Sequence, residues 1–131
     1  MIVLADEVID ILQRAAELRS DRMQLLAGNV ANIDTPGYLP VDLDFQKELR
    51  RYLAGSPVVR TDERHLPPPP TDVQPEVFSD PQIQPGLDGN AVSLERQVAK
   101  IGENRMLYEA TLQALRKKLA LLRYAVNEGG A

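Results

Sequence analysis

The stretch Ala27-Gly28-Asn29-Val30-Ala31-Asn32-Ile33-Asp34-Thr35-Pro36-Gly37-Tyr38 decides the course of the chain, because it closes the first segment of periodic apolar residues with a sharp stop. Thr35 precedes a proline, which disfavours the helical region of backbone space. Pro36 and Gly37 suit the two central positions of a type II turn, where proline fixes φ and glycine supplies a positive φ. Asn32 and Asp34 can cap the helix end or bond to the local backbone. We therefore predict a long helix followed by a fixed change of direction, although any exit from a helix can use these residue types.

The composition of the 131-residue chain favours helix-on-helix packing in one domain. It has two Phe and no Trp, so aliphatic side chains must form the core. A net charge of −4 argues against nucleic acid as a partner, and the absence of cysteine excludes disulfides and thiolate metal sites. No segment has the roughly 18 apolar residues that would span a bilayer. The apolar start, MIVLADEVIDIL, carries acids and lacks a basic leader, so we expect no cleaved signal peptide.

Both ends of the chain carry apolar residues at spacings of three and four, the pattern of a long helix that pairs with another helix. All positions but an arginine are apolar in each row. Ser93 is a candidate N-cap for the second helix, and Gly129-Gly130 can end it. The first row is Ile2, Ala5, Ile9, Leu12, Ala16, Arg19, Met23, Leu26, Val30 and Ile33. The second row is Leu94, Val98, Ile101, Arg105, Tyr108, Leu112, Leu115, Leu119, Leu122 and Val126.

The middle of the chain is proline-rich and favours irregular structure. A short helix is predicted within 42–53, with Phe45, Leu49, Tyr52 and Leu53 on one face. The run 67–70 is all proline, which favours polyproline II, and 58–61 and 73–78 can form short extended pieces or a loose hairpin. We therefore divide the chain into an N-terminal helix with its turn (1–38), an irregular middle (39–90) and a C-terminal helix (91–131), of which the first and last form one helical core.

The simplest arrangement of the mainly α chain is an antiparallel coiled-coil hairpin of the two terminal helices. Aligning Ile2 with Val126 would place Arg19 near Glu109, either as a polar layer or with the arginine extended to the edge of the contact. This alignment also places Asp6, Glu7 and Asp10 beside Arg123, Lys118 and Lys117. Such a pair buries too little surface, so we expect further apolar side chains to stay partly exposed and neighbouring subunits to cover them. These side chains are Leu18, Leu25, Leu107 and Leu121, and Met106 also lies off the row, which suggests a second contact surface.

Four stretches of the sequence resemble one family. ANIDTPGY, preceded by LLAGNV, resembles the N-terminal signature of bacterial flagellar rod, hook and related axial proteins. The C-terminal segment is similar to the last helix of proximal rod proteins of the FlgB type, through Glu103-Asn104, Tyr108, Ala110 and Leu115. RTDERHL (60–66) and VDLDFQKEL (41–49) resemble two central segments of the same family. The proline run and the short middle match it less well.

The resemblance implies a structural subunit of the flagellar basal-body rod in the periplasm, exported by the flagellar type III apparatus without a cleaved signal. Implied partners are other copies, other rod proteins, and the adaptor protein and export gate at the rod base, with no nucleic acid. The polymer contacts that it implies are Asn29, Asn32, Thr35, Pro36, Gly37, Tyr38, Asn104 and Tyr108. We add five leucines of the two rows as candidate contacts, namely Leu12, Leu26, Leu112, Leu115 and Leu119.

The residues themselves predict no catalytic, cofactor or metal site. His65 is the only histidine and lies between Arg64 and Leu66 rather than among ligands. Asp42 and Asp44 are most simply solvated acids of a loop, and the basic run 116–118 a solvated helix face. The alternative function is a soluble helical-hairpin adaptor or export chaperone, which would present the same amphipathic helices to a different client.

Overall fold

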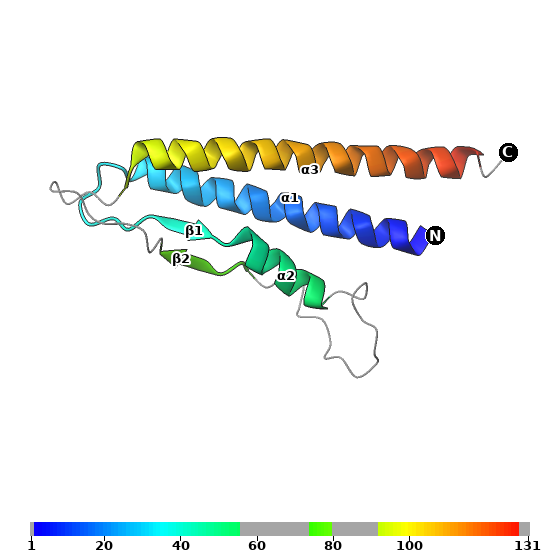
Figure 1. The fold of residues 1–131 in the computed structure, drawn as a ribbon, viewed down its shortest axis with the longest axis horizontal. Helices are drawn as coiled ribbons and strands as arrows, with labels where there is room; N and C mark the ends of the chain where they lie inside the picture. The colour runs from blue at the N-terminus through cyan, green and yellow to red at the C-terminus, as the bar shows by residue number, and fades with distance from the viewer. Residues whose placement is uncertain (1, 56–73, 80–91, 129–131) are drawn as a thin grey trace.

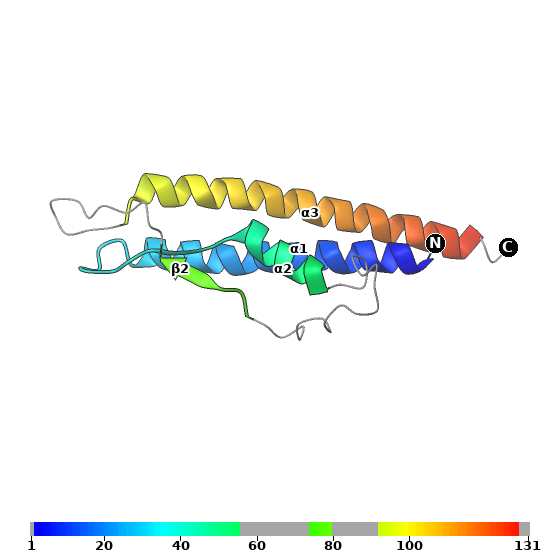
Figure 2. The same ribbon diagram turned by 60° about the horizontal axis from the view of Figure 1, so that its bottom comes forward.

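The computed structural model describes residues 2–55, 74–79 and 92–128, and two long helices dominate it. Helix α1 (Ile2–Ala31) and helix α3 (Leu94–Glu128) run antiparallel, side by side. Figure 1 shows the start of α1 and the end of α3 at the same end of the molecule, and the view in Figure 2 keeps them together. The chain is therefore mainly α, with its two terminal helices paired as predicted. No helix within the described ranges is both long and apolar enough to cross a membrane.

The turn after α1 has the predicted form. The amide of Tyr38 donates to the carbonyl of Thr35 at 3.3 Å, and Gly37 between them has a φ of 74°, as position i+2 of a type II turn requires. The Asn32 side chain caps the helix, because its Nδ2 donates to the Gly28 carbonyl at 2.9 Å. The change of direction is thus fixed by local hydrogen bonds.

The smaller elements lie along α1, which separates most of them from α3 (Figure 1). Strand β1 (Val41–Leu43) pairs antiparallel with strand β2 (Val77–Ser79), with Asp42 opposite Phe78. Between them in sequence, the predicted short helix is confirmed as α2 (Phe45–Gly55). The sequence pattern did not predict β1, whose partner strand overlaps the extended piece expected at 73–78. The pieces predicted at 58–61 and 67–70, His65 and the helix end predicted at Gly129-Gly130 lie outside the described residues.

The caps of the two later helices follow from their first residues. Asp44 precedes α2 and its Oδ1 accepts the Lys47 amide at 3.0 Å, an N-cap bond. The predicted N-cap Ser93 is confirmed, since its Oγ accepts the Arg96 amide at 3.4 Å and its carbonyl accepts the Gln97 amide at 3.0 Å.

The apolar core gathers around the half of α1 nearest the turn. Leu18 and Leu26 have no exposed surface, and Leu43 of β1 is 2% exposed. The expectation that Leu18 would stay partly exposed was wrong, because α2 and β1 contact α1 as well as α3 does. The remaining core residues are the small or branched Ala15, Ala16 and Val92.

Helix α3 is rotated relative to the prediction. Gln97 and Asn104 face α1 and are buried, whereas Leu94, Val98 and Val126 of the predicted row are half or more exposed. The predicted row is therefore only partly covered. Its half-buried members are Ile101, Tyr108, Leu112, Leu115 and Leu122, and its other members are exposed.

The predicted register of the hairpin was also wrong. Arg19 lies beside Asn104, with Nη1 donating to its Oδ1 at 3.4 Å, and Glu109 accepts instead from Arg105 of its own helix. Within the described residues, the acids at the start of α1 and the bases near the end of α3 form no ion pairs with each other. Buried polar groups near the turn after α1 therefore set the alignment of the two long helices. The charges at the opposite end of the hairpin, where α1 begins and α3 ends, do not set it.

Candidate interaction site

The side chain of Asn29 joins three elements near the end of α1. It is 1% exposed, and its Nδ2 donates to the Val41 carbonyl at 2.7 Å and to Gln97 Oε1 at 3.0 Å. Its Oδ1 accepts from the Val41 amide at 3.0 Å and from the Tyr38 hydroxyl at 3.2 Å. Both donors and both acceptor positions of the amide are therefore used, which offsets the cost of burying it. The Asn29 side chain thus makes the two hydrogen bonds to Val41 of β1 that the backbone of a neighbouring strand would make. It holds the residues that follow the turn against both long helices.

Asp42 forms a second joint, between β1, α1 and α3. It is 4% exposed, and Arg22 binds both of its oxygens, with Nε at 2.8 Å and Nη2 at 3.0 Å. Lys100 of α3 donates to Oδ2 at 3.0 Å, and the amide of Leu43 donates to Oδ1 at 2.7 Å. The expectation of a solvated acid was wrong for Asp42. Asp44, two residues later, is exposed and caps α2.

The charges at this joint stabilise each other. Burial alone would raise the pKa of Asp42, but the hydrogen bonds from Arg22, the Leu43 amide and Lys100 outweigh it and lower the pKa below its ordinary value. The hydrogen bond to Asp42 raises the pKa of Arg22 in return, against the opposing effect of its own burial. The joint is therefore a charged ion pair at neutral pH.

Arg19, which interrupts the apolar row of α1, connects α1 to both neighbouring helices. Its guanidinium carbon lies 3.6 Å from the centre of the Phe45 ring of α2, a cation–π distance. Its carbonyl accepts the Asn104 Nδ2 of α3 at 2.8 Å. Burial, and then the charge of Arg22, lower the pKa of Arg19. The arginine is thus part of a polar layer, with Asn104 in place of the expected glutamate.

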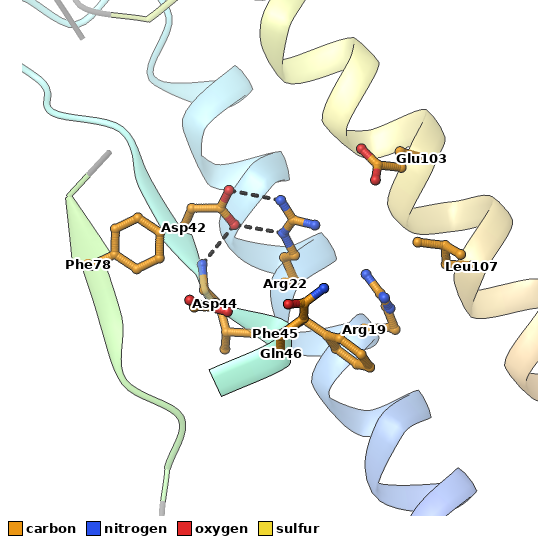
Figure 3. A pocket seen from close by; sticks show the side chains of 10 residues that line it. Arg19, Arg22, Asp42, Asp44, Phe45, Gln46, Phe78, Glu103 and Leu107 are labelled. Carbon is orange, nitrogen blue, oxygen red and sulfur yellow. Dashed lines mark hydrogen bonds and ion pairs between the residues drawn. The ribbon is translucent and has the colours of Figure 1, made fainter. Parts of the chain in front are cut away.

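A cavity of about 350 Å³ opens beside these charges, between α3 and the β1–α2 connection (Figure 3). In the close-up, Arg22 points at Asp42, while Glu103 and Leu107 of α3 border the other side. Groups of the chain itself occupy both Asp42 oxygens on this wall of the cavity, so the carboxylate is not free to bind a ligand there. Within the described ranges no three histidine, cysteine or acidic side chains are placed to hold a metal ion.

Comparison with known proteins decides the family. No protein-family model matches the chain. It is 35% identical over 127 residues to the flagellar basal body rod protein FlgB of Escherichia coli (strain K12), covering 88% of this chain and 89% of that protein. The chain belongs to the FlgB family of flagellar basal body rod proteins. The FlgB proteins of Salmonella typhimurium and Cereibacter sphaeroides are each 32% identical to it, over 91% and 87% of this chain and 92% and 89% of their own lengths.

The structure divides the contact residues predicted for this FlgB family member into three groups. Leu26, Asn29 and Asn104 are buried, and their observed contacts are within the chain. Thr35, Pro36, Gly37 and Leu119 are exposed. The others are half-buried, namely Leu12, Asn32, Tyr38, Tyr108, Leu112 and Leu115. For all of them a role in polymer contacts stays a prediction.

Several residues of the polar joints were not predicted from the sequence. Arg22, Gln97 and Lys100 make the contacts that tie β1 and the two long helices of this FlgB family member together. One local signal was present, because Gln97 and Asn104 are seven residues apart, beside the apolar row and in its period. Arg22 carried no comparable signal, since its partner Asp42 lies in another element.

Proposed function

We propose that this chain is a structural subunit of the proximal rod of the bacterial flagellum, and that copies of it polymerise through their terminal helices into a hollow shaft that transmits torque. Family membership supports the rod, and one structural observation supports the polymerisation. Helix α3 exposes a large set of apolar side chains along its length, an arrangement typical of a surface that a partner covers. These side chains are Leu94, Val98, Met106, Leu119, Leu121, Tyr124 and Val126.

The stiffness that torque requires would arise between subunits. A hairpin of two helices can bend, whereas helices packed on several sides by neighbours resist bending because every deformation disrupts many contacts. Within each subunit, the joints at Asn29 and Asp42 would keep β1 and α2 at a fixed angle to the long helices. Each subunit would thus contribute a rigid end near the turn and an apolar surface on α3 that binds neighbouring subunits.

The proposal includes a place and partners. The rod lies in the periplasm, and the subunit would reach it by the flagellar export apparatus without a cleaved signal. Its neighbours would be other copies, other rod proteins, and the adaptor protein and export gate at the rod base. The exposed turn residues Thr35, Pro36 and Gly37, with Leu119 on α3, are the predicted contacts most accessible to them.

Deletion of residues 2–12 tests this function. The deletion removes the first turns of α1 and with them part of the surface that pairs with α3, so we expect no completed rods and no swimming. A matched control is Gln24→Ala, an exposed position on the same helix, which should leave swimming unchanged. Basal bodies purified from the wild type should contain the chain as a stoichiometric component. Complete rods in the deletion strain, or absence of the chain from basal bodies, would instead favour an adaptor or chaperone.

A further inference from the structure

The last turns of α3 present an outward row that α1 does not cover. Leu112, Arg116, Leu119, Arg123 and Val126 follow each other at spacings of four, three, four and three, the period of helix pairing. Leu119 is 49% exposed and Val126 is 70% exposed, and both arginines are exposed. Residues 111–127 contain no acid, so this outer row is apolar and positively charged.

Helix α1 presents a row of the opposite charge. Asp6, Asp10, Gln13 and Glu17 are exposed and follow each other at spacings of four, three and four. Along this acidic row lies a cavity of about 320 Å³, lined by Asp10, Gln13, Arg14, Glu17 and Tyr52 of α2. The acidic row therefore borders a groove with an aromatic side wall rather than a flat surface.

The two rows do not neutralise each other within one chain. The start of α1 and the end of α3 lie at the same end of the hairpin (Figure 1), yet in the described part of the chain Asp10, Arg116 and Arg123 form no ion pair. Glu17 is bound by Arg14 of its own helix at 3.3 Å. The exposed charges of Asp10, Arg116 and Arg123 are thus left to solvent in one chain, whereas Glu17 already has Arg14 beside it.

We propose that the outer row of α3 in one copy packs antiparallel along the acidic row of α1 in a second copy, an inference that rests on the proposed function. Arg116 and Arg123 are seven residues apart, as are Asp10 and Glu17. At 1.5 Å per residue both pairs are about 10.5 Å apart along their helices. Arg116 then faces Glu17 and Arg123 faces Asp10, while Leu119 enters the groove beside Gln13.

This contact joins two different surfaces, which has a consequence for assembly. Each bound copy still offers its own free outer row or acidic row, so the contact repeats instead of closing into a symmetric dimer. The antiparallel direction also places acids at a helix N-terminus beside bases at a helix C-terminus, where both suit the helix dipoles. Ion pairs at exposed positions stabilise little, so the charges set register and the burial of Leu119 and Val126 supplies the attraction.

Disulfide cross-linking in purified basal bodies tests the contact directly, because the chain has no cysteine of its own. One copy carries Gln13→Cys and a second, distinguished by mass, carries Leu119→Cys. We expect oxidation of purified basal bodies to link the two copies to each other. In the control, Gln24→Cys replaces Gln13→Cys. Gln24 is exposed on the same helix, about 16 Å further along the helix axis. Equal or greater linking of the control would overturn the proposal.

Charge reversal tests the register. Arg116→Glu with Arg123→Glu, and separately Asp10→Arg with Glu17→Arg, should each reduce swimming and cross-linking at least about tenfold, and all four changes together should restore both. Circular dichroism of each purified variant checks that the helices persist. If the combined variant is not restored and copies do not cross-link, another protein occupies the row and the proposal fails. The deletion of residues 2–12 is a separate test, so complete loss of rods there with unaffected charge variants would retain the rod function and reject this contact.

Discussion

At the scale of single residues, the fold depends on polar side chains that the chain itself saturates. Asn29 and Asp42 belong to residue types that usually mark exposed turns, yet each is buried with every hydrogen-bonding group in use. A buried polar group of this kind stabilises one arrangement strongly because any alternative leaves it unpaired. As a result, the end of the hairpin near the turn after α1 has one fixed geometry.

Asp42 should make the stability of the chain depend on acidic pH. Its pKa is lowered in the folded chain, so the unfolded chain takes up a proton first as the pH falls below the ordinary value of 3.8, and stability decreases through that window. Asp42→Asn removes the charge that Arg22 and Lys100 require, and should cost about 3 kcal/mol at neutral pH. The difference in the free energy of unfolding between Asp42→Asn and the wild type should shrink toward about pH 2.

Urea unfolding followed by circular dichroism, repeated at several pH values, measures this effect. Asp34→Asn is the matched control, because Asp34 is exposed on the turn and the change should leave the pH profile of the wild type in place. A constant difference between Asp42→Asn and the wild type at all pH values would show that the ion pair does not cause the dependence.

Gly37 and Gly102 should respond in opposite directions to alanine. Neither has an atom within 4 Å of the place that a Cβ would occupy, so only the backbone decides. Gly37 has a φ of 74°, and Gly37→Ala should lower the free energy of unfolding by about 1–2 kcal/mol. Gly102 lies inside α3, and Gly102→Ala should raise it by about 0.5–1 kcal/mol. Urea unfolding of both variants checks the signs, and a stabilising Gly37→Ala would rule out the type II turn.

At the scale of elements, the sequence predicts what local patterns control. The two long helices, α2, the Ser93 cap and the turn at Gly37 follow from apolar spacing, capping residues and the Pro-Gly pair. The rotation of α3 and the register could not be predicted, because they depend on pairs such as Asn29 with Gln97 and Arg19 with Asn104. Strand β1 was missed for the same reason, since its pairing partners lie on α1 and β2.

The cap of α2 gives a prediction at this scale. A helix of 11 residues has little stability of its own, and Asp44 satisfies an amide that would otherwise be free at its start. Asp44→Ala should cost about 1 kcal/mol, whereas Asp44→Asn should cost only a few tenths. Hydrogen exchange of the first amides of α2 measures the local loss. Gln46→Ala, an exposed change in the same turn, serves as the control, and an equal effect there would remove the cap from the explanation.

At the scale of the whole molecule, the two ends of the hairpin differ in how completely they are packed. Among the side chains that the structure describes in α1, the buried ones lie between Ala15 and Asn29, and the buried residues of α3 are Gln97 and Asn104. Toward the other end, every described side chain of α3 after Leu122 is exposed. The end near the turn is therefore held by contacts within the chain, and the opposite end of α3 is exposed, as the proposed packing against other subunits requires.

The free chain should therefore be unevenly stable along α3. In dilute solution, backbone amides after Leu122 should exchange with solvent orders of magnitude faster than those around Asn104, because few tertiary contacts oppose their local opening. In intact basal bodies, the same amides should become as protected as those around Asn104, since neighbouring subunits would exclude water from both sides. Hydrogen exchange of the purified chain and of basal bodies, read by mass spectrometry, compares the two states. Uniform protection of α3 in the free chain, with full helicity and one cooperative melting transition, would show that the subunit needs no neighbours to complete its fold.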